Sequence, residues 1–109
     1  MENTWATISS HPKYQVSRDG RVRSTKYRGQ DEVRELSLLN GKTGYRFVIL
    51  DRKTCYVHRL VAEAFLPNPD NFPQINHKDE NKANNSVENL EWCSAKYNVN
   101  YGSRSRRVS

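Results

Sequence analysis

The sequence has few of the features that mark zinc-binding, secreted or membrane-bound proteins. Its only two cysteines, Cys55 and Cys93, do not form the C-x-x-C pair that typically holds structural zinc. We expect two reduced thiols near the core, although the sequence alone leaves a disulfide open. Nothing resembles a signal peptide, and the longest apolar stretches, such as residues 47–50, are too short to cross a bilayer. These absences predict a soluble intracellular protein.

The charge is distributed unevenly along the 109 residues. A net charge of +6 arises from 18 basic and 12 acidic side chains. Residues 1–60 form a basic front, residues 61–103 are mildly acidic, and Arg104, Arg106 and Arg107 make the tail basic again. A basic balance favours polyanion binding, but an ordinary solvated surface would have the same composition. With 35% hydrophobic residues, the chain supports a modest core, in one domain or two small joined ones.

The first half is typical of short strands. An Asp-Gly turn at residues 18–20 separates two alternating runs, residues 14–17 and 21–24, which predicts a hairpin. Val16 and Val22 should face one side of it, and the neighbouring arginines the other. After a charge-rich loop at residues 25–35 and a turn at residues 41–44, a second hairpin is expected. Its predicted parts are a strand at 45–50, a turn at 51–54 and a strand at 55–57.

A helix and a second strand pair are expected in the other half. Leu60, Val61, Ala64 and Phe65 fall at helical spacing, which predicts a helix over residues 58–66 that is ended by prolines. The elements expected next are an extended stretch at 73–77, a loop at 78–87, a strand at 89–93 and a helix at 95–101 with Ser94 as its N-cap. That order could bring Asn76, His77 and Asn98 into one small cleft.

Three segments carry a resemblance to a known family. Residues 57–65 (VHRLVAEAF), 76–79 (NHKD) and 84–92 (NNSVENLEW), with Asn98 following, resemble the HNH endonucleases of the homing and phage type. Residues between Trp5 and Ser24 resemble the short DNA-associated module, of the NUMOD4 type, that often precedes such domains. The resemblance extends over nearly the whole chain apart from the loop near residues 25–44 and the tail.

The resemblance implies an α+β fold and a nuclease activity. It predicts a ββα-metal (His-Me finger) core at residues 56–102, preceded by a small antiparallel β DNA-binding region at 1–55 and followed by a flexible basic tail at 103–109. The implied function is metal-dependent endonucleolytic hydrolysis of phosphodiester bonds, by nicking or double-strand cleavage. The implied partner is double-stranded DNA, the oligomeric state a monomer or homodimer, and the location the cytoplasm of a bacterial or phage-infected cell.

Four residues match the chemical positions of the family. His77 matches the general base that takes a proton from the attacking water, and an imidazole pKa of about 6.5 suits that role. Asn76 and Asn98 match the ligands of one divalent cation, for which Mg²⁺ is the natural candidate and Mn²⁺ a substitute. Asn89 matches the central asparagine, whose implied role is to tie the loop together through backbone hydrogen bonds.

One position departs from the commonest family pattern. Many members have Asp where this chain has Asn76, and two neutral amides attract Mg²⁺ less strongly than an amide and a carboxylate. Metal affinity would then depend on the substrate phosphate, or on Asp79 or Glu91 nearby. A DNA-binding module with weak or absent catalysis is therefore an alternative function. An RNA-directed protein is a third, less favoured because no aromatic stacking motif of the RRM type is present.

Other polar residues have simpler expected roles. Seven basic residues are predicted to contact DNA, with ordinary solubilising charge as the alternative: Arg21, Arg23, Lys26, Arg28, Arg46, Arg52 and Lys53. His58 is expected to pack against or cap the helix. Trp92 is expected in the core, and Asn81, Asn84 and Asn85 are explained most simply as turn residues.

Overall fold

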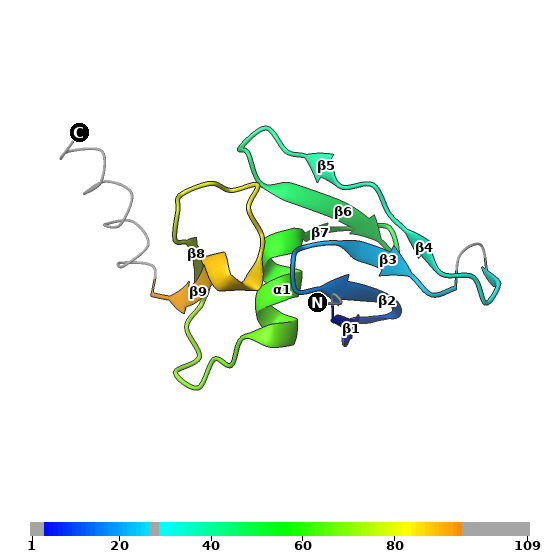
Figure 1. The fold of residues 1–109 in the computed structure, drawn as a ribbon, viewed down its shortest axis with the longest axis horizontal. Helices are drawn as coiled ribbons and strands as arrows, with labels where there is room; N and C mark the ends of the chain where they lie inside the picture. Colours follow the sequence, from blue (N-terminus) through cyan, green and yellow to red (C-terminus); the bar gives the residue numbers. More distant parts are fainter. Residues whose placement is uncertain (1–3, 27–28, 95–109) are drawn as a thin grey trace.

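The computed structural model describes residues 4–26 and 29–94 of the chain. Within these ranges, one α-helix lies among three small antiparallel sheets (Figure 1). The first sheet contains β1 (Trp5–Ile8), β2 (His11–Ser17), β3 (Val22–Ser24) and β4 (Arg34–Glu35). The second contains β5 (Leu39–Asn40), β6 (Arg46–Leu50) and β7 (Lys53–Tyr56), and the third β8 (Gln74–His77) and β9 (Leu90–Cys93). This arrangement confirms the predicted α+β class.

The predicted front hairpin is present as β2 and β3. Val16 pairs with Val22 across the two strands, and both side chains are fully buried. The connecting turn is closed by two hydrogen bonds: Ser17 N–H donates to the Arg21 carbonyl at 2.8 Å, and Gly20 N–H to the Ser17 carbonyl at 3.1 Å. Gly20 has φ +87°, the left-handed conformation that a three-residue hairpin loop requires at this position.

The second hairpin differs from its prediction in the length of its turn. Residues Asp51 and Arg52 alone connect β6 to β7, and both have positive φ, as in a type I′ turn. The expected four-residue turn is therefore wrong, because Lys53 and Thr54 already pair with β6. The segment expected as a loop at 25–35 also ends in a short strand, β4, whose Glu35 pairs with Arg23.

The helix α1 (Val57–Phe65) lies one residue earlier than predicted. It also ends one residue earlier than predicted, at Phe65: Leu66 has extended backbone angles (φ −110°, ψ 119°), because the residue before a proline avoids the helical region. Ala64 is exposed, contrary to prediction, whereas Ala62 is fully buried. Ala62 is buried because α1 is covered on two sides, so its buried arc extends beyond the single predicted face.

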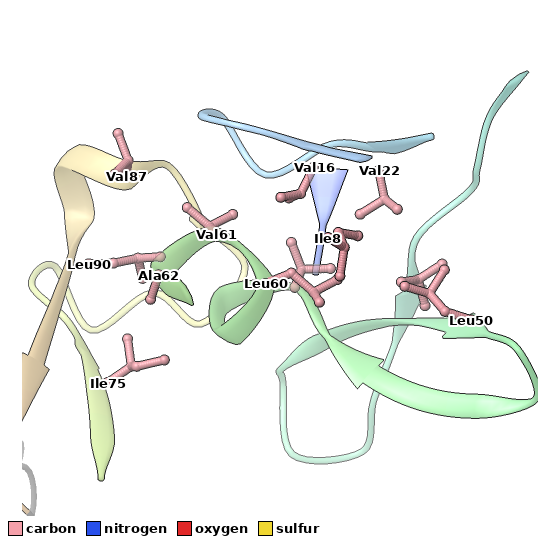
Figure 2. Packing of buried hydrophobic residues seen from close by; sticks show 12 residues of the cluster. Ile8, Val16, Val22, Leu50, Leu60, Val61, Ala62, Ile75, Val87 and Leu90 are labelled. Carbon is pink, nitrogen blue, oxygen red and sulfur yellow. The ribbon is translucent and has the colours of Figure 1, made fainter. Parts of the chain in front are cut away.

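The hydrophobic core joins the front and rear halves of the chain through α1. Figure 2 shows Ile8, Val16, Val22 and Leu50 on one side of the helix. On its other side lie Ile75, Val87 and Leu90, from the β8–β9 region. The predicted DNA-binding region (1–55) and the predicted nuclease core (from residue 56) both contribute side chains to this one core. The boundary between them therefore stays a functional prediction.

The rear half forms the strand–loop–strand unit expected from the sequence. A short 3₁₀ helix, η2 (Val87–Asn89), precedes β9, so Asn89 ends this turn and does not open the strand as predicted. The helix predicted over 95–101 and the tail at 103–109 lie outside the described residues. Cys55 and Cys93 are free thiols. Among the residues described, none of the helices has the length and apolar character needed to span a bilayer.

Candidate active site

His77 ends β8 and is held by a side-chain hydrogen bond. The residue pairs with Leu90 of β9, and only 5% of it is exposed. Its Nε2 lies 2.8 Å from Oδ1 of Asn85, which is itself buried in the loop between β8 and η2. A neutral imidazole carries one N–H and one lone pair. Because Oδ1 can only accept, this contact favours the tautomer with its proton on Nε2 and its lone pair on Nδ1.

The surroundings of His77 favour its neutral form. Burial lowers the pKa of His77 below its ordinary value of 6.5, and the nearby Lys82 ammonium acts in the same direction. The Asn85 hydrogen bond and the Asp79 carboxylate oppose this change and raise the pKa of His77. The net direction is downward, so the imidazole is available to accept a proton at neutral pH.

Aromatic rings surround the same histidine. The ring of His58, in the first turn of α1, is centred 5.3 Å from His77 and 4.9 Å from Tyr45. Tyr45 also lies 5.9 Å from His77, and the ammonium of Lys82 lies 4.7 Å from the Tyr45 ring. His58 thus packs, as expected, but it packs beside the predicted catalytic residue. The structure brings these residues together because α1 and the start of β6 both lie against the β8 region.

His58 is the more strongly perturbed of the two histidines. Burial, together with the neighbouring His77 and Arg59, lowers the pKa of His58 to about 4. Its Nδ1 is buried without a hydrogen-bond partner. A protonated ring there would require desolvation of a charge, so His58 is neutral across the physiological range.

A pocket of about 420 Å³ opens beside this aromatic cluster. Side chains from four parts of the chain line it: Thr43, Tyr45, Tyr56, His58, Arg59, Gln74 and Ile75. The volume falls in the range of pockets that hold small ligands, and the lining combines aromatic surface with polar and cationic groups. This composition suits contact with the sugar, base or phosphate of a nucleotide.

Asn76 lies next to a carboxylate on the neighbouring strand. Its Nδ2 donates to Oε2 of Glu91 at 2.8 Å, and Asn76 is only 4% exposed. Because this hydrogen bond involves the amide nitrogen, the amide oxygen of Asn76 could act as a ligand to a cation. Carboxylate and amide oxygens are the ligands that a hard divalent ion prefers, so the side chains present fit such an ion.

The second predicted metal ligand, Asn98, lies outside the described residues. Within residues 4–26 and 29–94, no group of three His, Cys, Asp or Glu side chains gathers in a way that could hold a metal ion. The metal ligands predicted from the sequence are instead the amide oxygens of Asn76 and Asn98. Of the two carboxylates considered as helpers, Glu91 contacts Asn76, whereas Asp79 bonds within the loop.

Asn89 is the centre of the hydrogen bonds that shape this loop. Its Oδ1 accepts from the Asp79 N–H at 3.0 Å, and its Nδ2 donates to the Asp79 carboxylate and to the Asn84 carbonyl, each at 2.9 Å. Bonds from Asn84, Asn89 and the Asn81 backbone also lower the pKa of Asp79. These contacts are those of a residue that ties the loop together, and they support the structural role predicted for Asn89.

The arginines of β3 and its preceding turn lie on the face predicted for them. Arg21 lies 6.0 Å and Arg23 lies 4.1 Å from the ring of Trp5, on the side opposite to the buried valines. Arg21 also forms an ion pair with Glu35, and Arg23 donates to Oε1 of Gln15 at 2.8 Å. Both guanidinium groups are thus ordered by neighbours, and their contact with DNA stays a prediction.

The other predicted DNA contacts are spread over a wider area. Lys26 forms an ion pair with an exposed aspartate of the following loop. Arg46 is half-buried in β6, and Arg52 and Lys53 are exposed at the turn that connects β6 to β7. Figure 1 shows this turn at the end of β6 away from β8. Arg28 lies outside the described residues.

Sequence reasoning missed several residues of the site. Asn85, interpreted as a turn residue, is the hydrogen-bond partner of His77. Tyr45 and Lys82 reach the site because the β8–η2 loop approaches the start of β6 (Figure 1), where Lys82 donates to the Thr43 carbonyl at 3.0 Å. These contacts join distant segments, and nothing in the local pattern of residues signals them.

Comparison with known proteins shows which proteins this site resembles. Residues 55–100 match the HNH endonuclease family model. An uncharacterised HNH endonuclease of Acanthamoeba polyphaga mimivirus is 37% identical over 93% of this chain, which spans 30% of that protein. The DNA endonuclease I-HmuI of Bacillus phage SP01 is 37% identical over 87% of this chain, which spans 55% of that protein.

A solved structure extends the similarity to the fold. The structure described as "DNA binding and cleavage by the HNH homing endonuclease I-HmuI" superposes with a TM-score of 0.76 and 36% identity, over 100% of this chain and 61% of that one. The chain therefore spans less than two thirds of the relatives it matches, and it shares the HNH fold of I-HmuI. The segment from residue 55 to residue 100 is therefore similar to the HNH endonucleases both in sequence and in fold.

Proposed function

We propose that this protein is a metal-dependent DNA endonuclease that hydrolyses phosphodiester bonds with His77 as its general base. The observation that carries the proposal is the state of His77, a buried neutral imidazole whose Nε2 is engaged by Asn85. Its Nδ1 therefore has the free lone pair that a general base needs. The similarity to I-HmuI, a protein described as binding and cleaving DNA, supports the substrate class.

The chain's own groups account for the proton transfer. Nδ1 of His77 accepts a proton from a water molecule as the water oxygen attacks the phosphorus of the scissile phosphate. The bond from that phosphorus to the departing oxygen breaks, and the departing oxygen takes a proton from solvent water. Burial keeps the imidazole neutral beforehand, and the adjacent Asp79 carboxylate favours the imidazolium that forms. The pocket formed by Tyr45, Tyr56 and His58 holds the DNA strand beside the reacting phosphate.

A divalent cation, with Mg²⁺ the natural choice, fits beside Asn76. Asn76 and Asn98 would supply amide oxygens, and Glu91 would supply the negative charge that two amides lack. When bound, such an ion neutralises charge on the scissile phosphate and on the departing oxygen. The Glu91 carboxylate also orients Asn76, since it accepts from the amide nitrogen and leaves the oxygen facing away from that bond.

Residues 1–55 are proposed as the DNA-binding module that precedes the nuclease core. The cations on the Trp5 face and at the β6–β7 turn would contact phosphates, which position the duplex without reading its sequence. Arg23 is the best placed of these, because its guanidinium is already ordered over an aromatic ring. The alternative is a DNA-binding module without catalysis, which would retain this surface and the fold.

A plasmid-cleavage assay distinguishes an endonuclease from a DNA-binding module without catalysis. Supercoiled plasmid is incubated with the wild-type protein in Mg²⁺, in Mn²⁺ and in EDTA, beside His77→Ala, with a matched RNA as a second substrate. We expect nicked or linear DNA only with metal, and loss of cleavage in His77→Ala. A wild-type protein that shifts DNA in a gel but never cuts it in either metal would support the binding module and overturn the proposed activity.

A second pair of variants tests the metal site. Glu91→Gln removes the carboxylate charge but keeps a side chain that can bond to Asn76, so half-maximal cleavage should require more Mg²⁺. Asn76→Asp adds a carboxylate at the position where many family members have one, so it should require less. An unchanged Mg²⁺ requirement in both variants would remove Asn76 and Glu91 from the metal site.

A further inference from the structure

The turn between β2 and β3 packs directly against the partner of the general base. A Cβ atom added to Gly20 would lie 3.0 Å from Cβ of Asn85 and 3.1 Å from its carbonyl oxygen. Any larger residue at position 20 would therefore push the Asn85 backbone away by a few tenths of an ångström, in addition to the strain of its positive φ. Gly20 and Asn85 are both buried, although they are 65 residues apart in the sequence.

A backbone hydrogen bond also joins the β2–β3 turn to the segment that follows Asn85. The N–H of Val87, in the first turn of η2, donates to the carbonyl of Arg18 at 2.8 Å. Val87 is buried in the core beside α1. The front hairpin thus holds the β8–η2 loop at two points, one immediately at Asn85 and one two residues later.

We propose that the β2–β3 turn positions the general base: it holds Asn85 in the place where its Oδ1 fixes the tautomer and orientation of His77. This inference rests on the proposed function, because it gives His77 the role of base. It assigns Asn85 as a positioning residue and the Arg18–Gly20 turn as its support. The segment predicted to bind DNA is therefore also part of the structure that sets up the chemistry.

The chemistry of the two side chains explains why position matters. An amide oxygen at 2.8 Å from Nε2 stabilises only the tautomer with its proton on Nε2 and its lone pair on Nδ1. If Asn85 moved away, the other tautomer would become accessible, and the ring would lose the contact that orients it. Partners that fix the tautomer and orientation of a metal-bound histidine contribute about tenfold to a hundredfold in activity, and we expect a loss of the same order here.

The first test measures the tautomer of His77 directly. Heteronuclear NMR distinguishes a protonated from an unprotonated imidazole nitrogen by chemical shift, in the full chain without metal or DNA. We expect a proton on Nε2 of His77 in the wild type, a mixture of tautomers in Asn85→Leu, and the wild-type tautomer again in Asn85→Asp, which restores an acceptor. A proton on Nδ1 in the wild type would overturn the inference without any variant.

The second test uses two glycines with similar positive φ angles. Gly20 (φ +87°) and Gly29 (φ +78°) both lie in the left-handed region, but a Cβ on Gly29 meets no atom within 4 Å. Gly20→Ala should lower the single-turnover cleavage rate at saturating protein about tenfold or more and alter the His77 nitrogen signals. Gly29→Ala should leave both unchanged. Equal effects of the two substitutions on rate would contradict the proposed support.

The two tests separate this inference from the proposed function. A wild-type protein that fails to cleave DNA but shows the Nε2 tautomer, lost in Asn85→Leu and in Gly20→Ala, refutes the enzymatic activity and leaves the positioning intact. A protein that cleaves DNA equally well in wild type, Asn85→Leu and Gly20→Ala refutes the positioning and leaves the activity intact. Thermal melts of each variant identify any loss of rate that is caused by unfolding.

Discussion

His58 makes the stability of the fold depend on pH. Its pKa is 6.5 in an unfolded chain and about 4 in the folded one, so the unfolded state binds more protons at every pH between these values. Stability therefore rises with pH across this window and is constant above it with respect to this group. Each unit of pKa difference corresponds to about 1.4 kcal/mol, which gives a loss of about 3 kcal/mol between pH 6.5 and pH 4.

This loss is large for a chain of this size, because small domains are stable by only about 5–15 kcal/mol. Urea unfolding of the wild type and of His58→Phe, followed by circular dichroism from about pH 7 to about pH 4, isolates the contribution. Phenylalanine retains a ring against Tyr45 and removes both the titration and the unpaired Nδ1. The wild type should lose stability more steeply than the variant as the pH falls. Parallel curves would refute a buried neutral His58.

Three further predictions concern the core, the loop and the DNA-binding face. Leu50→Ala should destabilise the fold by about 2–5 kcal/mol in urea unfolding because Leu50 is fully buried, and a loss no larger than that of the exposed Ile49→Ala would contradict the assigned core. Asn89→Ala should accelerate hydrogen exchange in the Asp79–Asn84 loop, whose bonds it removes, and unchanged protection there would oppose its structural role. Arg23→Ala should lower the slope of log affinity against log salt by about one if it contacts a phosphate, and an unchanged slope would remove Arg23 from the DNA interface.

Elements fixed by local chemistry were predictable from the sequence. The β2–β3 hairpin follows from alternation around an Asp-Gly turn, and α1 ends before Pro67 because proline restricts the preceding residue. The turn at Asp51 and Arg52 was predicted too long, because a two-residue turn with two positive φ angles usually contains Asn or Gly. The strands β4 and β5 have two residues each, too few for alternation to be recognised.

The site around His77 was predictable only in part from the sequence. The resemblance predicted His77, Asn76 and Asn89 from their order and spacing, and the first two lie side by side at the end of β8. Asn85 and His58 could not be assigned to the site, because their contacts with His77 arise from the path of an irregular loop and from helix packing. An Asn-rich loop has the same composition whether its amides form turns or hold a catalytic side chain.

The most direct test of the central claim compares His77→Ala with the wild type in single-turnover cleavage of one DNA substrate in Mg²⁺, with DNA affinity measured separately in EDTA. A general base contributes about 10²–10⁴-fold, so the rate constant should fall by that factor while the dissociation constant changes little. A His77→Ala rate within about threefold of the wild type would contradict the assignment of His77 as the general base.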